Sequence, residues 1–152
     1  MSSHIITLLA VAALSLASFA CSQKEPAPSV SNALQRTLDN AAADLVNIGE
    51  LAVFDWDQLY IFGPYASPSF ICERLGYDKP KCEDANFPQV GEGESLLVFL
   101  RRDNAVRKET LSVRVAGFDR QDLARPITRA KAVFVIKRVT GGAVLSCKEC
   151  RP

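Results

Sequence analysis

Histidine is almost absent from this sequence, because His4 is the only one in 152 residues. A Ser-His-Asp triad, a Cys-His pair and a histidine-ligated zinc or copper site all require an imidazole. The first twenty residues have the features of a removable export signal, so the remaining chain contains no histidine. We therefore expect a protein that is not an enzyme and that holds no metal and no cofactor.

Motifs for binding phosphate groups and nucleic acids are also missing. The stretch GEGES at 91–95 lacks the Lys-Ser/Thr that closes a phosphate-binding loop, and we interpret it as a flexible connection. Asp55 and Asp57 flank Trp56, but one such pair lies too close together to straddle a glycosidic bond. We interpret the two aspartates as a solvated strand end, and we expect no nucleic-acid partner.

The first twenty residues contain no Asp, Glu, Lys or Arg. Their apolar run, Ile5 to Ala17, is too short to span a bilayer as a helix and is typical of an export signal. The next stretch, CSQKEPAPSV, is polar with two prolines and reads as an extended tether. We therefore divide the chain into a signal at 1–20, a tether at 21–30 and a single domain at 31–152.

The stretch SLASFAC, in which Ala20 precedes Cys21, resembles the lipobox at which bacterial prolipoproteins are acylated on cysteine and cleaved. Ser18 and Phe19 stand where that family usually has Leu and a small residue, so ordinary secretory cleavage after Ala20 is the alternative. Acylation of Cys21 leaves four other cysteines, an even number that suits an oxidising compartment, whereas ordinary cleavage leaves five. We therefore expect Cys21 to carry the lipid.

Ser22 follows this cysteine, where lipoproteins retained in the inner membrane of enterobacteria carry Asp. The resemblance therefore implies a location in the bacterial cell envelope, facing the periplasm and anchored by lipid to the outer membrane. A soluble periplasmic or secreted protein is the alternative.

Charge is distributed unevenly along the chain. Residues 22–99 hold 5 basic and 12 acidic side chains, and residues 100–152 hold 13 basic and 5 acidic, which gives balances of −7 and +8. Either the two halves pack together and neutralise each other, or a basic face meets an anionic envelope component or an acidic protein. The first interpretation is the simpler one.

Two helices are predicted. Ser31 is a candidate N-cap, and apolar residues at three- and four-residue steps predict an amphipathic helix that continues to Gly49. Ser67 followed by Pro68 predicts the start of a second helix, which Gly76 ends after two turns.

Strands account for most of the remainder. A strand is predicted at 57–62, a long connection at 77–95, and a strand with two apolar faces at 95–100. Alternating residues predict another strand at 110–115, and Thr140-Gly141-Gly142 predicts the turn of a final hairpin. Helices followed by mostly antiparallel strands indicate an α+β fold, a single domain with two helices on a sheet of about four to five strands.

Four cysteines remain after Cys21, and they allow three pairings. Proximity favours pairing within the first two and within the last two, whereas joining the last strand to the connection at 77–95 would fasten more of the fold. The C-terminal CKEC is also compatible with thiol–disulfide redox chemistry, but no helix follows it to lower a thiol pKa. We expect structural disulfides formed by Cys72, Cys82, Cys147 and Cys150.

Residues 54–70 are rich in aromatic side chains. Strand alternation predicts that Trp56, Tyr60 and Phe62 share one face and Leu59 and Ile61 the other, so most of these side chains are expected in the core.

Two candidate binding features remain. Tyr65 follows Gly63-Pro64 in a turn, and an exposed aromatic side chain on a rigid turn is suited to anchoring a partner. A basic cluster surrounds the predicted turn at Asp103-Asn104, either as a solvated rim or as an anion-contacting patch. Its members are Arg101, Arg102, Arg107 and Lys108.

The run WDQLYIFGPY resembles a group of small bacterial lipoproteins that carry a similar Trp-Asp, Tyr, Phe-x-Pro-Tyr pattern before a short helix ending in Leu-Gly. The match covers residues 55–76. It implies that the domain is a family unit, and it transfers no catalytic residue to this chain.

Two functions are compatible with these observations. The first is a non-enzymatic, envelope-anchored lipoprotein whose domain binds another protein, as an inhibitor or immunity protein does, or an envelope component. The alternative is a periplasmic thiol–disulfide redox protein that uses Cys147 and Cys150.

Overall fold

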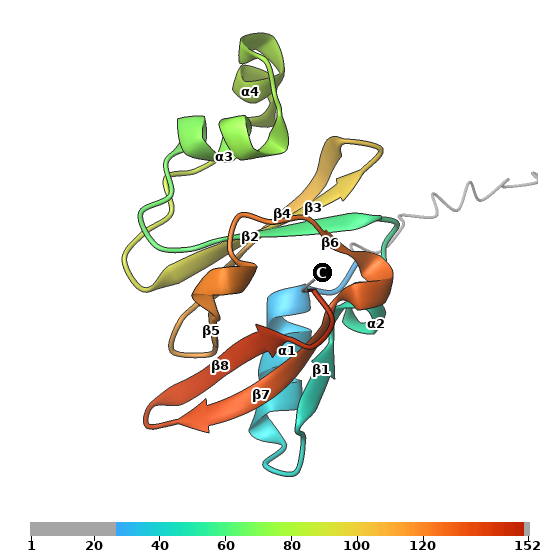
Figure 1. The fold of residues 1–152 in the computed structure, drawn as a ribbon, viewed down its shortest axis with the longest axis vertical. Coiled ribbons are helices and arrows are strands. Elements are labelled where there is room, and N and C mark those ends of the chain that lie inside the picture. Colours follow the sequence, from blue (N-terminus) through green and yellow to red (C-terminus); the bar gives the residue numbers. More distant parts are fainter. Residues whose placement is uncertain (1–26, 151–152) are drawn as a thin grey trace, which may run out of the picture.

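The computed structural model describes residues 27–150, which form one α+β domain with two mostly antiparallel sheets. The predictions for the signal, for Cys21 and for most of the tether lie outside the described residues. The α+β class is confirmed, but the strands divide between two four-stranded sheets rather than forming one (Figure 1). No helix within residues 27–150 is both long enough and apolar enough to cross a membrane.

The first sheet has the strand order β4-β3-β2-β6. Strands β2 (Gln58–Phe62) and β3 (Glu94–Arg101) pair antiparallel, as do β3 and β4 (Asn104–Ser112). The short β6 (Ile127–Thr128) completes it beside the start of β2. The strands predicted at 57–62 and 95–100 are therefore confirmed. The strand predicted at 110–115 begins earlier and ends at Ser112.

The second sheet has the strand order β1-β7-β8-β5. The final hairpin, β7 (Val133–Val139) and β8 (Gly142–Cys147), forms as the glycine-containing turn predicts. β1 (Leu45–Asn47) pairs with β7 antiparallel, and β5 (Gly117–Phe118) pairs with β8 in parallel.

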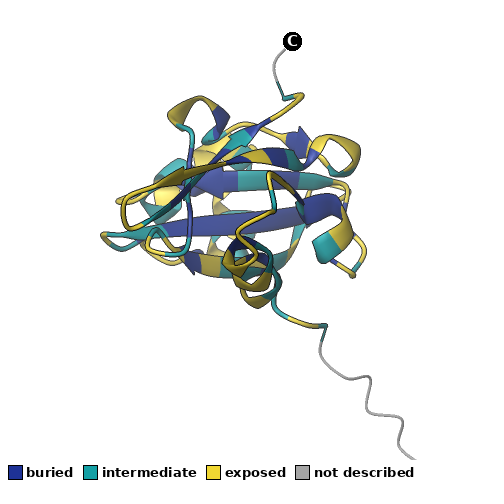
Figure 2. Ribbon diagram, turned by 90° about the horizontal axis from the view of Figure 1, so that it is seen from below, coloured by how far each residue is buried: buried dark blue, intermediate teal, exposed yellow. Residues whose placement is uncertain are grey.

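Strand β3 lies at the centre of the packing. Every residue from Ser95 to Leu100 is buried, because side chains cover both faces of the first sheet. On one face, Leu97 and Phe99 join the larger core with α1 and the second sheet, whereas Leu96 and Val98 join a smaller core under α3 and α4. Figure 2 shows this buried layer along the strands, with exposed residues at the turns and helices.

Strand β2 divides its side chains in the same way. Leu59 and Ile61 lie in the larger core and Phe62 in the smaller one, with Tyr60 packed against it. Trp56 lies in the larger core with Leu59, so the prediction that it shares a face with Tyr60 and Phe62 is wrong. The reason is that β2 begins at Gln58, and strand alternation does not extend back to Trp56.

The first helix is shorter than predicted. α1 spans Val30–Asp39, its N-cap is Ser29, and the following residues form β1 and a short α2 (Ile48–Leu51). The apolar residues that continue the helical spacing are used in these other elements: Val46 and Ile48 are buried in the larger core, whereas Leu45 is exposed.

The second predicted helix is confirmed at both ends. α3 spans Pro68–Leu75, with Ser67 as its N-cap and Gly76 in the left-handed conformation at its C-cap. The connection predicted at 77–95 instead contains a further helix, α4 (Lys79–Ala85), which starts at the N-cap Asp78. Two 3-10 turns, η1 (Arg120–Asp122) and η2 (Arg129–Lys131), lie in the C-terminal half.

Both disulfides join the cysteines that are closest in sequence. Cys72 in α3 pairs with Cys82 in α4, and Cys147 at the end of β8 pairs with Cys150. The first bond fastens the two helices that cover the smaller core. The alternative pairing of the last strand with the 77–95 segment does not occur.

Candidate binding site at the turn after strand β2

The turn after β2 is fixed by backbone hydrogen bonds. The Tyr65 N–H donates to the Val90 carbonyl at 3.0 Å, and the Val90 N–H donates to the Ala66 carbonyl at 3.0 Å. The Gln89 side-chain amide also donates to the carbonyls of Tyr65 and Ala66, at 3.0 and 3.2 Å. The turn is therefore held by a segment that lies more than twenty residues further along the chain.

This turn presents Tyr65 to solvent, as predicted. Its side chain is 67% exposed, and its φ of 66° places it in the left-handed region. A residue with a Cβ loses roughly 1–2 kcal/mol in that conformation. The exposed aromatic side chain is thus carried by a backbone that distant hydrogen bonds hold in a conformation that local preference does not favour.

An open depression of about 370 Å³ lies beside Tyr65. Its floor includes the buried Phe62, and Phe70 of α3 contributes a second aromatic ring, 6.2 Å from that of Phe62. Aliphatic groups from the segment after η1 complete it. The residues that line the depression are Phe62, Gly63, Pro64, Tyr65, Ala66, Ser67, Phe70, Leu123 and Ala124.

Leu123 and Ala124 come from a distant part of the chain. The Ala124 N–H donates to the Ile61 carbonyl at 2.8 Å, and Ala124 has a φ of 54°. A Cβ on Gly63 would lie 3.0 Å from Leu123 Cδ1, so glycine there lets the two segments approach. Two non-glycine residues with positive φ therefore line the same depression, and such residues concentrate at functional sites.

The basic cluster predicted around the β3–β4 turn does not form a single patch. Arg101 pairs with Asp55 at 2.7 Å, and the Arg102 backbone N–H donates to Asp57 Oδ2 at 3.1 Å. Arg107 and Lys108 are successive residues of β4 and point to opposite faces of the sheet. The two aspartates expected at a solvated strand end thus contact the last residue of β3, Arg101, and the residue that follows it, Arg102.

Several cations from the C-terminal half bind backbone carbonyls of the N-terminal half. Arg138 donates to Leu38 and Asn40 at the end of α1, at 2.9 and 2.6 Å. Arg129 donates to the carbonyls of residues 49, 52 and 54 around α2, and Lys108 donates to those of residues 85 and 86 at the end of α4.

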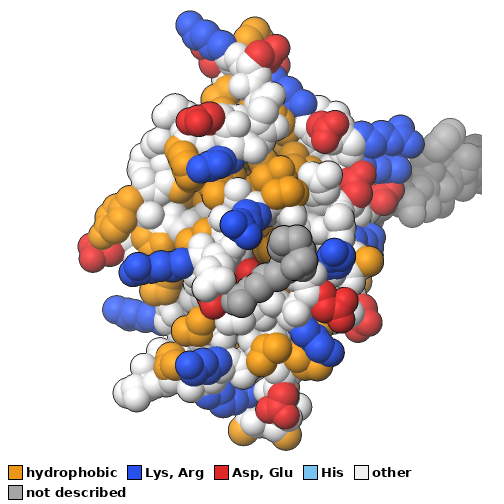
Figure 3. Space-filling view, in the orientation of Figure 1, with side chains coloured by type: hydrophobic (Ala, Val, Ile, Leu, Met, Phe, Trp, Pro, Cys, Tyr) orange, Lys and Arg blue, Asp and Glu red, His pale blue; other side chains and the backbone are white. Residues whose placement is uncertain are grey.

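These contacts account for part of the uneven charge along the chain. Helix C-termini carry partial negative charge and unpaired carbonyls, so a cation placed there is stabilising. On the face shown in Figure 3, basic and acidic side chains are interspersed rather than separated.

The surroundings of the C-terminal disulfide favour a structural role. Asp122 is only 4% exposed, and its Oδ2 accepts the Cys147 N–H at 2.7 Å. The Lys131 carbonyl oxygen lies 3.5 Å from Cys147 Sγ and 3.8 Å from Cys150 Sγ. The electron-rich Lys131 carbonyl oxygen beside both sulfurs disfavours a thiolate, the reactive form in thiol–disulfide exchange.

Within residues 27–150, no three His, Cys, Asp or Glu side chains lie close enough together to hold a metal ion.

The pKa of Tyr77 is raised by burial, and its hydroxyl accepts the Ala105 N–H at 2.8 Å, which places it in a structural contact between α3, α4 and β4. Sequence reasoning missed Leu123, Ala124 and Asp122, because no motif around them indicates the distant segments that they contact.

The chain matches no family model, no curated protein and no solved structure.

Proposed function

We propose that this protein is a non-enzymatic lipoprotein of the bacterial envelope, anchored through Cys21, and that its domain binds another protein through the depression beside Tyr65. The observation that supports this proposal most directly is an exposed tyrosine held at positive φ on the rim of an apolar depression. Rigid aromatic side chains lose little entropy on binding and are frequent at the centres of interfaces.

The size of the depression favours a protein side chain as its occupant. At about 370 Å³ it is near the lower limit for pockets that enclose a small molecule, and it is open to solvent. It suits one bulky apolar side chain projecting from a partner, with contacts around the rim supplied by the rest of the partner's surface.

The anchor is tested by replacing Cys21 with Ser in cells grown with a radiolabelled fatty acid. We expect the unchanged protein to carry label and to sediment with outer membranes, and Cys21→Ser to carry none. An unlabelled, soluble native protein would favour ordinary secretion instead.

Binding is tested with the oxidised domain as bait in a detergent extract of the envelope, followed by titration of the purified captured protein. Tyr65→Ala should weaken its affinity at least tenfold. Val53→Ala is the matched control, because Val53 is 64% exposed but lies outside the depression. Equal affinity for Tyr65→Ala and the native domain would reject the depression as the binding site.

A further inference from the structure

The lining of the depression beside Tyr65 carries no charge. All the residues that line it are uncharged, and Tyr65 and Ser67 supply its only side-chain hydroxyl groups. Interfaces of this kind have an apolar centre surrounded by a polar rim. The charge that a partner meets here therefore comes from residues that flank the lining.

Two exposed arginines flank it. Arg74 lies in the last turn of α3, and its guanidinium stands over the ring of Phe70, 5.2 Å from the ring centre. Arg125 directly follows Ala124 and is also exposed. Phe70 and Ala124 both belong to the lining, so a cation is attached to each of two segments that meet at the depression.

The acidic residue closest in sequence to the lining is turned into the protein. Asp122 precedes Leu123, but it is only 4% exposed. Its Oδ2 accepts the Cys147 N–H at 2.7 Å. On the segment after η1, the anionic side chain is therefore buried and the cationic side chain of Arg125 faces solvent.

Two other carboxylates lie near these segments in sequence. Glu73 precedes Arg74 in α3, but successive residues of a helix point about 100° apart, so Glu73 does not share the position of Arg74 over Phe70. Glu92 follows the segment that holds the turn, and it lines a separate hollow with Arg114. The charged side chains that flank the depression most directly are thus the two arginines.

Both guanidiniums are available to a ligand. Within residues 27–150, neither Arg74 nor Arg125 forms an ion pair, whereas Arg101 and Arg107 each pair with a carboxylate. A guanidinium that stacks on a ring through its face keeps its in-plane N–H groups, which match the two oxygens of a carboxylate. The stack on Phe70 also restricts the Arg74 side chain before binding, which lowers the entropy lost on binding.

We infer that the partner of the depression is an acidic protein, in which an apolar side chain enters the lining and neighbouring carboxylates bind Arg74 and Arg125. This inference rests on the proposed function, because it names the partner of the same depression. A polyanionic glycan would offer the charges but no apolar side chain for the lining. An acidic protein segment fits both parts of the site.

The inference is tested by NMR on isotopically labelled mature chain, residues 21–152 with Cys21→Ser and both disulfides formed. The probes are three synthetic peptides that carry a central Phe flanked by Glu, by Gln or by Lys. The amide resonances of Leu123 and Ala124 report occupation of the depression, because both residues line it. Titration at low ionic strength gives the dissociation constant of each peptide.

We expect the Glu peptide to bind at least about threefold more tightly than the Gln peptide and the Lys peptide to bind most weakly. High salt should remove these differences. Arg74→Gln combined with Arg125→Gln should abolish the preference, and Arg74→Glu combined with Arg125→Glu should reverse it in favour of the Lys peptide.

A matched control separates the rim from the net charge of the protein. Arg36→Glu combined with Lys137→Glu changes the net charge by the same amount as the double Glu variant of Arg74 and Arg125. Both control residues are exposed, in α1 and β7, and neither lines the depression. The control should therefore keep the native preference for the Glu peptide.

The outcomes distinguish this inference from the proposed function. Equal binding of the three peptides, or a reversed preference in the control, would overturn the inference and leave the depression as a binding site. If no peptide moved the resonances of Leu123 and Ala124, the depression and the proposed function would be rejected together. Tighter binding of polygalacturonate than of the Glu peptide would make the partner a polyanionic glycan and overturn the inference.

Discussion

The guanidinium of Arg138 in β7 donates to the carbonyl oxygen of Leu38 in the last turn of α1, at 2.9 Å and one hundred residues apart in sequence. Asn40, the C-cap residue of α1, offers its carbonyl to the same guanidinium. A strand side chain thus completes the C-terminus of a helix whose own sequence supplies no glycine there.

Replacing Arg138 with Met should lower the free energy of unfolding by about 1–2 kcal/mol, because charge-assisted hydrogen bonds to helix carbonyls are lost. Lys137→Met is the control, since Lys137 is exposed on the neighbouring position of the same strand and should change stability little. Urea denaturation of both variants compares them directly. Equal destabilisation would show that the Arg138 contacts contribute nothing specific.

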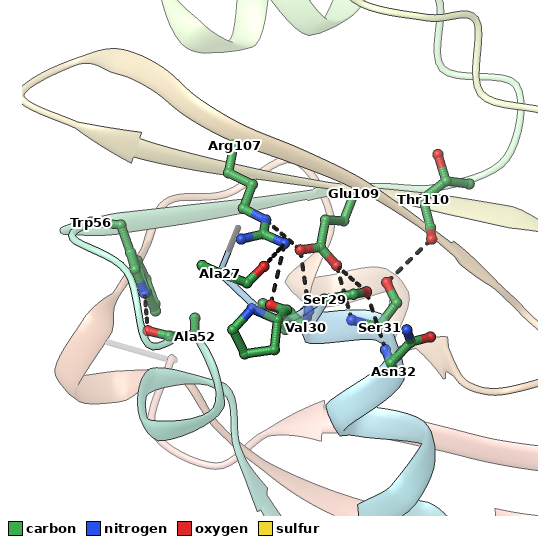
Figure 4. A network of polar contacts seen from close by, with 11 residues as sticks. Ala27, Ser29, Val30, Ser31, Asn32, Ala52, Trp56, Arg107, Glu109 and Thr110 are labelled. Atoms are coloured by element: carbon green, nitrogen blue, oxygen red, sulfur yellow. Dashed lines mark hydrogen bonds and ion pairs between the residues drawn. The ribbon is translucent and has the colours of Figure 1, made fainter. Parts of the chain in front are cut away.

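Glu109 should make stability depend on pH in the acid range. Burial tends to raise its pKa, but hydrogen bonds from residues 29–31 and the Arg107 charge outweigh that effect (Figure 4). The pKa in the folded protein is therefore lowered from the ordinary value of 4.5, so the contribution of Glu109 is fully present above that value and is lost as pH falls through the folded pKa. Glu109→Gln should therefore flatten the loss of stability below about pH 4.5. Thermal unfolding of both proteins between neutral and acid pH measures this, and parallel curves would contradict it.

The two disulfides should differ in their contribution to stability. Loop-closure entropy predicts about 3 kcal/mol for the bond between Cys72 and Cys82 and about 2 kcal/mol for that between Cys147 and Cys150. The first bond also joins α3 to α4, so its loss should loosen the smaller core. Replacing each pair with alanines and measuring urea unfolding tests the order; a larger loss from the C-terminal pair would reverse it.

Asp122 should slow reduction of the C-terminal disulfide. Cys147 is buried and Cys150 is less so, so an external thiolate reaches Cys150 more easily and releases the Cys147 thiolate beside the Asp122 carboxylate. Asp122→Asn keeps an acceptor for the Cys147 N–H and removes the charge, and it should speed reduction by dithiothreitol several-fold. The reduction rate of the Cys72–Cys82 bond serves as the internal reference. If the Cys147–Cys150 bond of Asp122→Asn is reduced at the native rate, Asp122 does not affect its reduction.

Elements with local signals at both ends were predictable from the sequence. α3 has Ser67, Pro68 and Gly76 at its boundaries, and the β7–β8 hairpin has glycines in its turn, so both form where those residues indicate. The exposure of Tyr65 followed from the turn that holds it.

Features that depend on distant contacts were not predictable. The helical spacing beyond Asp39 is overridden because β1 pairs with β7, about ninety residues later. The depression needs Leu123 and Ala124 against the turn at 63–67. The chain before α1 is likewise held by side chains about eighty residues later, because Glu109 accepts the Val30 N–H and Arg107 donates to the Ala27 carbonyl. In a basic segment, sequence alone does not separate cations that bind backbone carbonyls from those that face solvent.

The pairing of β1 with β7 also constrains the order of folding. The strand at 45–47 gains its partner only when residues 133–135 are available, and the end of α1 gains Arg138 at the same time. Contacts of such long sequence separation form late and slowly. The N-terminal elements therefore remain without these partners until almost the whole chain has been synthesised.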